Sequence, residues 1–449
     1  MDYRRDDTIA ALATPPGSGA VAIVRLSGPQ ARSIGSELTG IDPRPRYAQL
    51  CTFRDDDGQR IDQGLLLFFP APRSYTGEDV IELHGHGGRV VSDWLLKRVV
   101  ALGARPAQPG EFTLRAFLNE KIDLIQAEAV ADLVDSGSQL AARAALRSLD
   151  GQFSSSVQAL QAELTQLRVQ VEAWLDFPDE ELEIDAAAQS HSRIDGLLTQ
   201  LAALAAAAQH GTILRDGLSV VIAGPPNAGK SSLMNRLAGY EAAIVTDIPG
   251  TTRDPLREHL SLDGLPVSII DTAGLRESTD PVEREGLRRA QTELARADRV
   301  LWVVDVREPL DTAISAARAE LGAATAFTLI RNKVDLSDGR VAATELGDIS
   351  VIRLSALTGK GLDLLKSHLQ ALAGWSGEVT GTFSARRRHL DAIDRAQRHL
   401  LAARAELDGA LELAAEELRG AQTALSELTG EFTSDDLLGE IFSSFCIGK

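Results

Sequence analysis

The sequence predicts a multidomain chain of mixed α/β and α+β class, and three patterns indicate this. Short apolar runs broken by glycine and proline fill the first 119 residues, while two long stretches rich in Ala and Leu have helical spacing. Between those stretches, an apolar run leads through a glycine-rich loop into an amphipathic segment, and a mostly parallel sheet is expected there. At 449 residues the chain is long enough for about three domains.

The first 119 residues are expected to form a mixed α+β domain. Apolar runs at 21–24, 65–69 and 80–83 are separated by turn residues. In the stretch 74–88, which includes the last run, His84 and His86 could share one side of a strand as metal ligands, but no cysteine or third ligand accompanies them. A ligand pocket or a glycine-packed turn is therefore the favoured interpretation of this stretch.

The two helical stretches are expected to pack together. Residues 120–210, interrupted near Phe177-Pro178, and residues 385–428 each carry an apolar stripe that neither could bury alone. The economical arrangement is one bundle with the intervening domain inserted between its helices. Junctions near 210–211 and 374–381 give domains at 1–119, 120–213 (first part of the helical domain), 214–375 (inserted domain) and 376–449 (second part).

A phosphate-binding loop opens the inserted domain. The apolar run 218–223 leads into Gly224-Pro225-Pro226-Asn227-Ala228-Gly229-Lys230-Ser231, and an amphipathic stretch follows. Glycines let backbone N–H groups converge on phosphate oxygens, and the helix N-terminus adds its positive end. Lys230 can reach the β- and γ-phosphates, and the Ser231 hydroxyl can ligate Mg²⁺. A glycine-rich turn without function does not explain this pattern.

Two further segments predict a nucleotide switch. Thr252, in Gly250-Thr251-Thr252-Arg253-Asp254, is the natural second hydroxyl for Mg²⁺ in a loop, 246–254, that would order around the γ-phosphate. Asp271-Thr272-Ala273-Gly274 ends the apolar run 267–270, so the carboxylate would emerge near the metal and the Gly274 N–H would face the γ-phosphate. The signal Asp263-Gly264 predicts a hairpin between this strand and 256–262.

Ras-like enzymes use a glutamine to orient the attacking water, but this chain has Leu275 at that position. An acidic loop follows, and from spacing alone Glu277, Asp280 or Glu283 could swing a carboxylate toward the γ-phosphate. The alternative is that all three are solvated loop charges.

A fourth segment predicts recognition of guanine. Asn332-Lys333-Val334-Asp335 follows the apolar run 327–330, and a carboxylate such as Asp335 only accepts hydrogen bonds, so it matches two donors on the guanine edge. Ser355 and Ala356, after the run 351–354, resemble the weaker element that backs the base. The ordered set of segments predicts binding of GTP and GDP.

Composition narrows the location and partners. The net charge of −18 disfavours unaided nucleic-acid binding, and two distant cysteines suit a reducing compartment. We find no apolar run near the roughly 20 residues of a membrane span and expect a cytosolic protein without membrane contact. Few of the 46 basic residues are lysines, which draws attention to Lys121 and Lys449. The C-terminal Phe442, Phe445 and Ile447 indicate a docked tail rather than a frayed end.

These motifs, taken end to end, resemble the MnmE (TrmE) family of tRNA-modification GTPases. Besides the GTPase segments, the resemblance rests on stretches at both ends of the chain: residues 7–17, 75–88, Pro109-Gly110-Glu111-Phe112-Thr113, Phe117-Leu118-Asn119 and Cys446-Ile447-Gly448-Lys449. It implies an N-terminal domain similar to folate-dependent aminomethyltransferases, a helical bundle and an inserted Ras-like P-loop GTPase domain. The N-terminal domain is expected to form a homodimer and to bind 5-formyl- or methylene-tetrahydrofolate through Arg25, Glu82, Lys121 and Lys449.

The resemblance also assigns roles in the GTPase domain. Glu283 is expected to orient the water, with Arg253 and Asp254 supporting the switch. A K⁺ ion held by Asn227 and the loop residues Thr246, Ile248 and Thr251 is expected to replace an arginine finger. The implied nucleotide contacts are Asn227, Ala228, Gly229, Lys230, Ser231, Ser232, Thr246, Asp247, Ile248, Pro249, Gly250, Thr251, Thr252, Asp271, Thr272, Ala273, Gly274, Asn332, Lys333, Asp335, Ser355 and Ala356.

In the family, the flavoprotein MnmG (GidA) joins in a heterotetramer to install an aminomethyl or carboxymethylaminomethyl group at carbon five of the wobble uridine of certain tRNAs. Cys446 is a candidate functional thiol, with a structural role about as well supported. A ribosome-assembly GTPase and a non-catalytic scaffold are the alternatives; the first would need an RNA-binding appendage, and no such basic segment is visible in the sequence.

Overall fold

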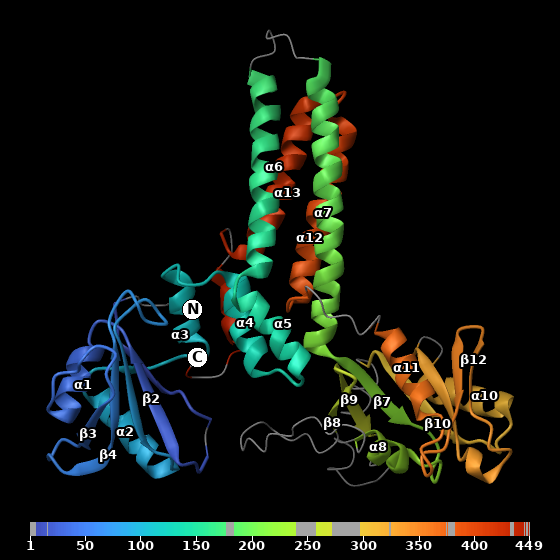
Figure 1. The fold of residues 1–449 in the computed structure, drawn as a ribbon, viewed down its shortest axis with the longest axis horizontal. Coiled ribbons are helices and arrows are strands. Elements are labelled where there is room, and N and C mark those ends of the chain that lie inside the picture. The colour runs from blue at the N-terminus through green and yellow to red at the C-terminus, as the bar shows by residue number, and fades with distance from the viewer. Residues whose placement is uncertain are drawn as a thin grey trace.

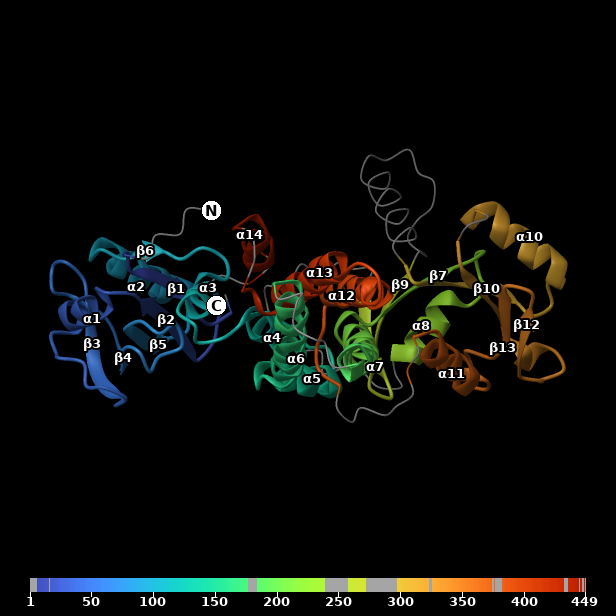
Figure 2. The same cartoon turned by 90° about the horizontal axis from the view of Figure 1, so that it is seen from above.

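The computed structural model describes residues 6–15, 17–176, 184–238, 257–271, 297–322, 325–373, 375, 382–431, 435–443, 445 and 448. An N-terminal unit of strands and helices lies on one side of an upright helical bundle, and a second sheet, which we call the inserted unit, lies on the other (Figure 1). Seen from above, the three parts form a row with the bundle in the middle (Figure 2). The predicted class, α+β plus bundle plus α/β, is confirmed.

The N-terminal unit contains a mixed sheet whose strand order is β3-β4-β5-β2-β1-β6. Its strands are β1 (Ile9–Leu12), β2 (Val21–Ser27), β3 (Gln49–Arg54), β4 (Arg60–Phe69), β5 (Val80–His86) and β6 (Arg105–Pro106). Helices α1 (Ala31–Thr39) and α2 (Arg89–Ala101) bury their apolar residues against one face of the sheet, and α3 (Glu111–Leu118) follows β6. The three apolar runs that predict strands all lie in strands.

The opposite face of this sheet carries the other set of alternating side chains. Leu50, Leu65, His84 and Ile23 lie side by side on this face by strand register, and Arg25 is paired with Glu82 on it. Leu50 is 69% exposed and Leu65 38% exposed. The face thus combines apolar exposure with charged residues of the expected folate set.

The bundle is built from helices that the two Ala- and Leu-rich stretches predict. They are α4 (Leu124–Val134), α5 (Gln139–Leu149), α6 (Gln152–Asp176), α7 (Ile184–Asp216), α12 (Arg387–Glu406) and α13 (Leu411–Thr429), and α14 (Asp435–Ser443) follows. Leu164, Leu201, Leu400 and Leu425 meet in one continuous core, because each helix turns its apolar stripe inward. The breaks at 135–138, 150–151 and 407–410 are not predicted from the sequence.

Helix α7 bears on the expectation that no apolar run approaches the length of a membrane span. Over Gln189–Asp216 it is long and apolar enough to cross a membrane by length and composition alone, the one such helix in the described part of the chain. Ile194, Leu197, Leu201 and Ala208 are buried in the bundle core, which accounts for much of the apolar stripe. Polar residues interrupt this stretch, and a buried core helix passes the same test, so α7 does not contradict the expectation of a chain without membrane contact.

The inserted unit contains a mostly parallel sheet, as predicted, in the order β12-β13-β11-β10-β7-β9-β8. Its strands are β7 (Leu218–Ala223), β8 (Arg257–Leu262), β9 (Leu265–Asp271), β10 (Arg299–Asp305), β11 (Phe327–Asn332), β12 (Ala342–Leu346) and β13 (Ile349–Arg353). Among the described strands of this sheet, only the two edge strands, β8 and β12, pair antiparallel with their neighbours. Helices α8 (Lys230–Ala238) and α11 (Leu362–Leu372) cover one face, and α10 (Leu310–Leu321) covers the other.

The structure tests two features that the sequence predicts for this unit, its hairpin at Asp263-Gly264 and the position of its first boundary. Asp263 and Gly264 have φ angles of 49° and 90°, so the β8–β9 connection is the tight hairpin that the sequence predicts. Helix α7 continues to Asp216, past the boundary expected at residue 213, and β7 begins two residues later at Leu218. The entry into the inserted unit is thus a continuous helix followed directly by the phosphate-loop strand.

Candidate functional site

The phosphate loop lies where β7 ends and α8 begins. Gly224 has a φ of 134°, and a Cβ added to it would lie 2.2 Å from the Val303 carbonyl oxygen of the neighbouring β10. Only glycine fits there, because both the backbone angle and the space exclude a side chain. The Lys230 ammonium donates to the carbonyl oxygens of Gly224 (2.8 Å) and Pro225 (2.9 Å). It therefore lies over the loop that would cradle the phosphates.

The Asn332 side chain joins three of the sequence motifs. It is 2% exposed, and its amide nitrogen donates to the Ala228 carbonyl oxygen of the phosphate loop at 2.9 Å. Its carbonyl oxygen accepts from the backbone N–H of Lys333 (2.8 Å) and of Ala356 (2.9 Å). A Cβ on Gly229 would lie 2.3 Å from this amide nitrogen, so the loop can approach Asn332 this closely only because residue 229 is glycine.

The base-recognition residues are held by neighbouring polar groups. Lys333 has a φ of 67°, and its ammonium donates to the Asn227 carbonyl oxygen at 2.7 Å. The Ser355 hydroxyl donates to the Asp335 carboxylate, which lies on the short helix η1 (Val334–Leu336). The carboxylate is therefore oriented beside the Ser355-Ala356 element, as an acceptor for a base needs.

Two residues of this site were missed by the sequence reasoning. Asp305, the last residue of β10, forms an ion pair with Lys333 at 3.2 Å, and hydrogen bonds from Arg307 hold its pKa well below the usual range. Its signal was available, because a carboxylate directly after an apolar run repeats the pattern of Asp271. Arg236 of α8 donates to the carbonyl oxygens of Ala356 (3.2 Å) and Leu357, and no sequence signal predicts such a reach.

Of the predicted switch residues, Asp271 lies within the described part of the chain and most of the others do not. Asp271 is the last residue of β9 and is paired in register with Ile222 of β7, so its backbone lies beside the strand that leads to the phosphate loop. The remaining switch candidates lie outside the described residues: Thr246, Asp247, Ile248, Pro249, Gly250, Thr251, Thr252, Arg253, Asp254, Thr272, Ala273, Gly274, Glu277, Asp280 and Glu283. Ser231 and Ser232 lie in the first turn of α8.

A second polar site lies in the N-terminal unit. Arg25 of β2 donates to the Glu82 carboxylate of β5 at 2.9 Å, and His84 lies 3.2 Å from the other Glu82 oxygen. The Arg25 guanidinium also lies 3.5 Å from the carbonyl oxygen of Gly448. The structure therefore brings two of the expected folate residues together and adds the residue beside Lys449; Lys449 and Cys446 lie outside the described residues.

Lys121 is linked to this site through the 75–77 loop. The side-chain carbons of Lys121 lie 3.4 Å from where a Cβ on Gly77 would be, and Arg25 lies 5.9 Å from the Tyr75 ring centroid. Burial raises the pKa of the Tyr75 hydroxyl, which shares a hydrogen bond of 2.9 Å with Thr113. One loop thus contacts both cationic candidates.

The C-terminal tail docks on the N-terminal unit, as the sequence predicts for two of its aromatic residues. Phe442 is fully buried and Phe445 is 5% exposed. Gly110 has a φ of 67°, and a Cβ there would lie 2.6 Å from the Phe442 carbonyl oxygen. Close backbone approach at this glycine therefore seats the tail, while Ile447 lies outside the described residues.

The histidines of β5 have carboxylate partners. The His86 ring lies 2.8 Å from Asp62, and hydrogen bonds from His86 outweigh the effect of burial and lower the Asp62 pKa. No group of three or more potential metal ligands occurs among the described residues. Each of these two histidines thus has a carboxylate neighbour, and the preference for a ligand pocket or packed turn over a metal site there stays a prediction.

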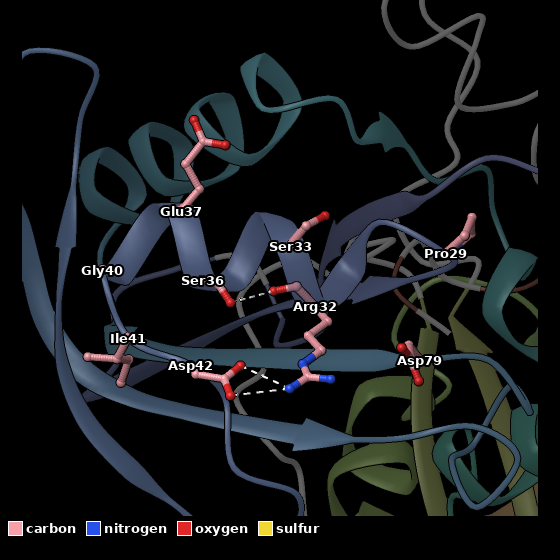
Figure 3. Close-up of a pocket in the computed structure, with 9 residues that line it drawn as sticks. All are labelled: Pro29, Arg32, Ser33, Ser36, Glu37, Gly40, Ile41, Asp42 and Asp79. Atoms are coloured by element: carbon pink, nitrogen blue, oxygen red, sulfur yellow. Dashed lines mark hydrogen bonds and ion pairs between the residues drawn. The ribbon is translucent and has the colours of Figure 1, made fainter.

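A surface hollow of about 750 Å³ lies beside α1, on the helix-covered side of the N-terminal sheet (Figure 3). Arg32 and Asp42, which line it, form an ion pair of 3.0 Å and so neutralise each other. It is lined by Pro29, Arg32, Ser33, Ser36, Glu37, Gly40, Ile41, Asp42 and Asp79, and none of the candidate residues is among them.

Comparison with known proteins agrees with this geometry. The family model for the GTP-binding protein TrmE N-terminus matches residues 8–121, and the MnmE helical domain model matches residues 124–446. The chain is 55% identical over 448 residues to the tRNA modification GTPase MnmE of Nitrosococcus oceani, covering 99% of this chain and 98% of that protein. It is 56% identical over 445 residues to the protein of the same name from Alkalilimnicola ehrlichii, covering 98% and 99%.

Among solved structures, the G domain of the T. maritima FeoB iron transporter matches 35% of this chain and 98% of that chain, with 24% identity and a TM-score of 0.25. The two near-full-length relatives and the two family models decide the assignment. The chain belongs to the MnmE (TrmE) family of tRNA modification GTPases.

Proposed function

We propose that this chain is a K⁺-stimulated GTPase that modifies the wobble uridine of certain tRNAs together with the flavoprotein MnmG (GidA). The reaction would install an aminomethyl or carboxymethylaminomethyl group at carbon five, using a one-carbon unit of 5-formyl- or methylene-tetrahydrofolate. The observation that carries the nucleotide part is the buried Asn332 side chain, which joins the phosphate loop to both base-recognition elements. The tail reaching the Arg25–Glu82 pair supports the folate part.

We divide the chain functionally as 1–119, a folate-binding and dimerisation domain; 120–213 and 376–449, the helical domain; and 214–375, the GTPase domain. The continuous helix α7 supports a first junction nearer residue 217 than 213. Gly217, between α7 and β7, has a φ of 68°, a turn that only a residue tolerant of the left-handed region makes readily.

The nucleotide site would work by charge and position. Asp335 would accept the two guanine donors, while Lys230 would leave the loop carbonyls for the β- and γ-phosphates. Mg²⁺ would be held by Ser231 and Thr252, and K⁺ by Asn227, Thr246, Ile248 and Thr251, with both cations supplying positive charge to the phosphates. The placement of Ser231 at the start of α8 and of Asn227 in the loop fits these two groups.

Hydrolysis needs a group that orients water, and Leu275 has no polar side chain. We assign this role to Glu283, a carboxylate that can accept a hydrogen bond from the water as it attacks the γ-phosphate. Arg253 and Asp254 would hold the switch in the reactive arrangement.

The folate site would use opposite charges for the two ends of its ligand. Lys121, Lys449 and the remaining N–H groups of Arg25 suit the glutamate carboxylates, and Glu82 suits the donor-rich pterin edge. The residues present fit such a ligand, because Tyr75, 38% exposed, offers a flat ring beside Arg25. Cys446 stays a candidate thiol of this site.

The protein would act in the cytoplasm as a homodimer within a heterotetramer. The open sheet face, with Leu50 69% exposed and Val21 54% exposed, supports self-association, since apolar area in water favours burial. The net charge of −18 favours a partner that carries much of the tRNA contact.

The test is Glu283→Ala, with Glu277→Ala as the matched control from the same acidic loop. We expect Glu283→Ala to lower GTP turnover in K⁺ at least about 100-fold while mant-GDP binding stays at the wild-type level. In cells lacking the protein, mass spectrometry of tRNA nucleosides should show the wobble modification restored by the wild type and by Glu277→Ala only. Persistent hydrolysis by Glu283→Ala would refute the assignment of the water-orienting residue, and unchanged nucleosides in the deletion strain would refute the modification role.

A further inference from the structure

One carboxylate holds both chain segments that connect the bundle to the inserted unit. Asp132, near the C-terminal end of α4, has a side chain only 7% exposed. Its Oδ1 accepts from Arg215 Nε at 2.9 Å, just before the chain enters the inserted unit. The same Oδ1 accepts from Arg386 Nη2 at 2.9 Å, and Oδ2 accepts from the Ser384 hydroxyl at 2.5 Å, just after the chain returns.

The returning segment is fixed to α5 as well. The Ser384 backbone N–H donates to the Ala144 carbonyl oxygen at 3.1 Å, and the Ser148 hydroxyl donates to the Ser384 carbonyl oxygen at 2.9 Å. A Cβ on Gly211 of α7 would lie 2.0 Å from the Phe383 carbonyl oxygen, so the entering helix and the returning segment touch. The two connections therefore form one joint, which we call the crossing joint (Arg215, Ser384 and Arg386 on Asp132).

Helix α4 has a second buried carboxylate one turn earlier. Glu128 is 1% exposed and binds both nitrogens of the Arg388 fork, at 2.7 and 2.8 Å. His389 accepts the Arg386 backbone N–H on Nδ1, so the neutral ring carries its proton on Nε2, which lies 2.8 Å from Glu128. Residues four apart lie on one helical face, so α4 presents Glu128 and Asp132 together to the returning chain.

The N-terminal half of α4 contacts the folate side of the molecule. Leu124 and Ala127 lie in one apolar cluster with Phe442 and Phe445 of the docked tail. That tail continues to Gly448 at Arg25, and Lys121 lies three residues before α4 begins. The helix has 11 residues and is about 16 Å long, and both sets of contacts lie on it.

We propose that Asp132 is a positioning residue that couples nucleotide state to folate binding, with α4 as the rigid element between the crossing joint and the tail. Any rotation of the inserted unit moves both crossing segments, and because both are bound to Asp132, it moves α4. Packed elements transmit displacement rather than absorb it. Movement of α4 then shifts the docked tail and Lys121 against Arg25. The proposal rests on the folate part of the proposed function.

The test measures linkage rather than activity. In the full-length protein, the affinity for 5-formyltetrahydrofolate is measured by titration calorimetry with GDP, and again with GDP plus aluminium fluoride in K⁺. For the wild type we expect the two affinities to differ about 5-fold or more, and linkage requires the reciprocal change in nucleotide affinity. In Asp132→Asn the ratio should fall below about 2-fold while each ligand still binds.

The matched control is Asp135→Asn, which removes the same charge from an exposed residue at the same end of α4. It should keep the wild-type ratio. If Asp132→Asn does not fold, Ser384→Ala removes one bond to the carboxylate without changing charge and should lower the ratio in the same direction. A wild-type ratio in both Asp132→Asn and Ser384→Ala, or equal affinities in the wild type, overturns the coupling role. Failure of the wild type to bind folate in either state overturns the folate assignment itself and this proposal with it.

Discussion

Asn332→Ala is the sharpest perturbation of the nucleotide site, because it removes one side chain from between three motifs. The side chain makes three hydrogen bonds, to Ala228, Lys333 and Ala356, in a position that is 2% exposed. Each bond contributes about 1 kcal/mol net, so the loss is about 2 to 3 kcal/mol depending on how far the elements relax. Since about 1.4 kcal/mol corresponds to a tenfold change, GDP affinity should fall about 30- to 140-fold.

The assay is fluorescence titration with mant-GDP, accompanied by the thermal midpoint of unfolding. The matched control is Asn235→Ala, the same substitution at an exposed position of α8, which should leave GDP affinity within about 2-fold of wild type. A folded Asn332→Ala protein that binds GDP as tightly as wild type would show that the three motifs are held together by something other than this side chain.

Two further predictions concern the other units. Burial opposes ionisation of the Glu128 carboxyl, but His389 and Arg388 outweigh this effect and lower the pKa of Glu128 far below 4.5. The ionised carboxylate therefore stabilises the fold fully above pH 4.5, and this stabilisation is lost as the pH falls toward the pKa in the folded state. Glu128→Gln should therefore lower the free energy of unfolding by about 3 kcal/mol near pH 7, and urea unfolding should show the difference narrowing toward about pH 3; a constant difference contradicts the charge argument. Gly110→Ala should release the tail and speed chymotryptic cleavage at Phe442, because the new Cβ meets the Phe442 carbonyl oxygen at 2.6 Å. Gly40→Ala, with a φ of 72° and open space around the new Cβ, is the control with equal backbone strain, and equal cleavage of the two variants would exclude the steric explanation.

Much of the inserted unit could be predicted because its signals are local. The strand at 218–223 is an unbroken apolar run with a glycine loop after it, and Asp263-Gly264 fixes its hairpin through two neighbouring φ angles. The break before α5 was missed because alanine and leucine continue on both sides, although Ser138 caps that helix by accepting from the Ala141 N–H at 3.1 Å. A serine before a helical run was a usable signal.

The joints between the units could not be predicted, because their partners lie far apart in sequence. Asp132 and Arg386 are separated by 254 positions, and neither residue stands in a recognisable motif. A carboxylate on an amphipathic helix is usually exposed to solvent, so the pattern around Asp132 predicts an exposed side chain although it is buried. Only the packing of α4 against the returning chain turns it into a buried acceptor.

The contact of Gly211 with the Phe383 carbonyl oxygen has a consequence for synthesis of the chain. Helices α12 and α13 complete the core of α6 and α7, yet they leave the ribosome only after the whole inserted unit has been made. Domains generally fold as units in the order of their synthesis, so the inserted unit should be folded before the helical bundle is complete. The two ends of the folded inserted unit lie close together, so they hold α7 beside the incoming α12. The entropic cost of bringing these helices together is then that of closing a short loop rather than a long flexible one.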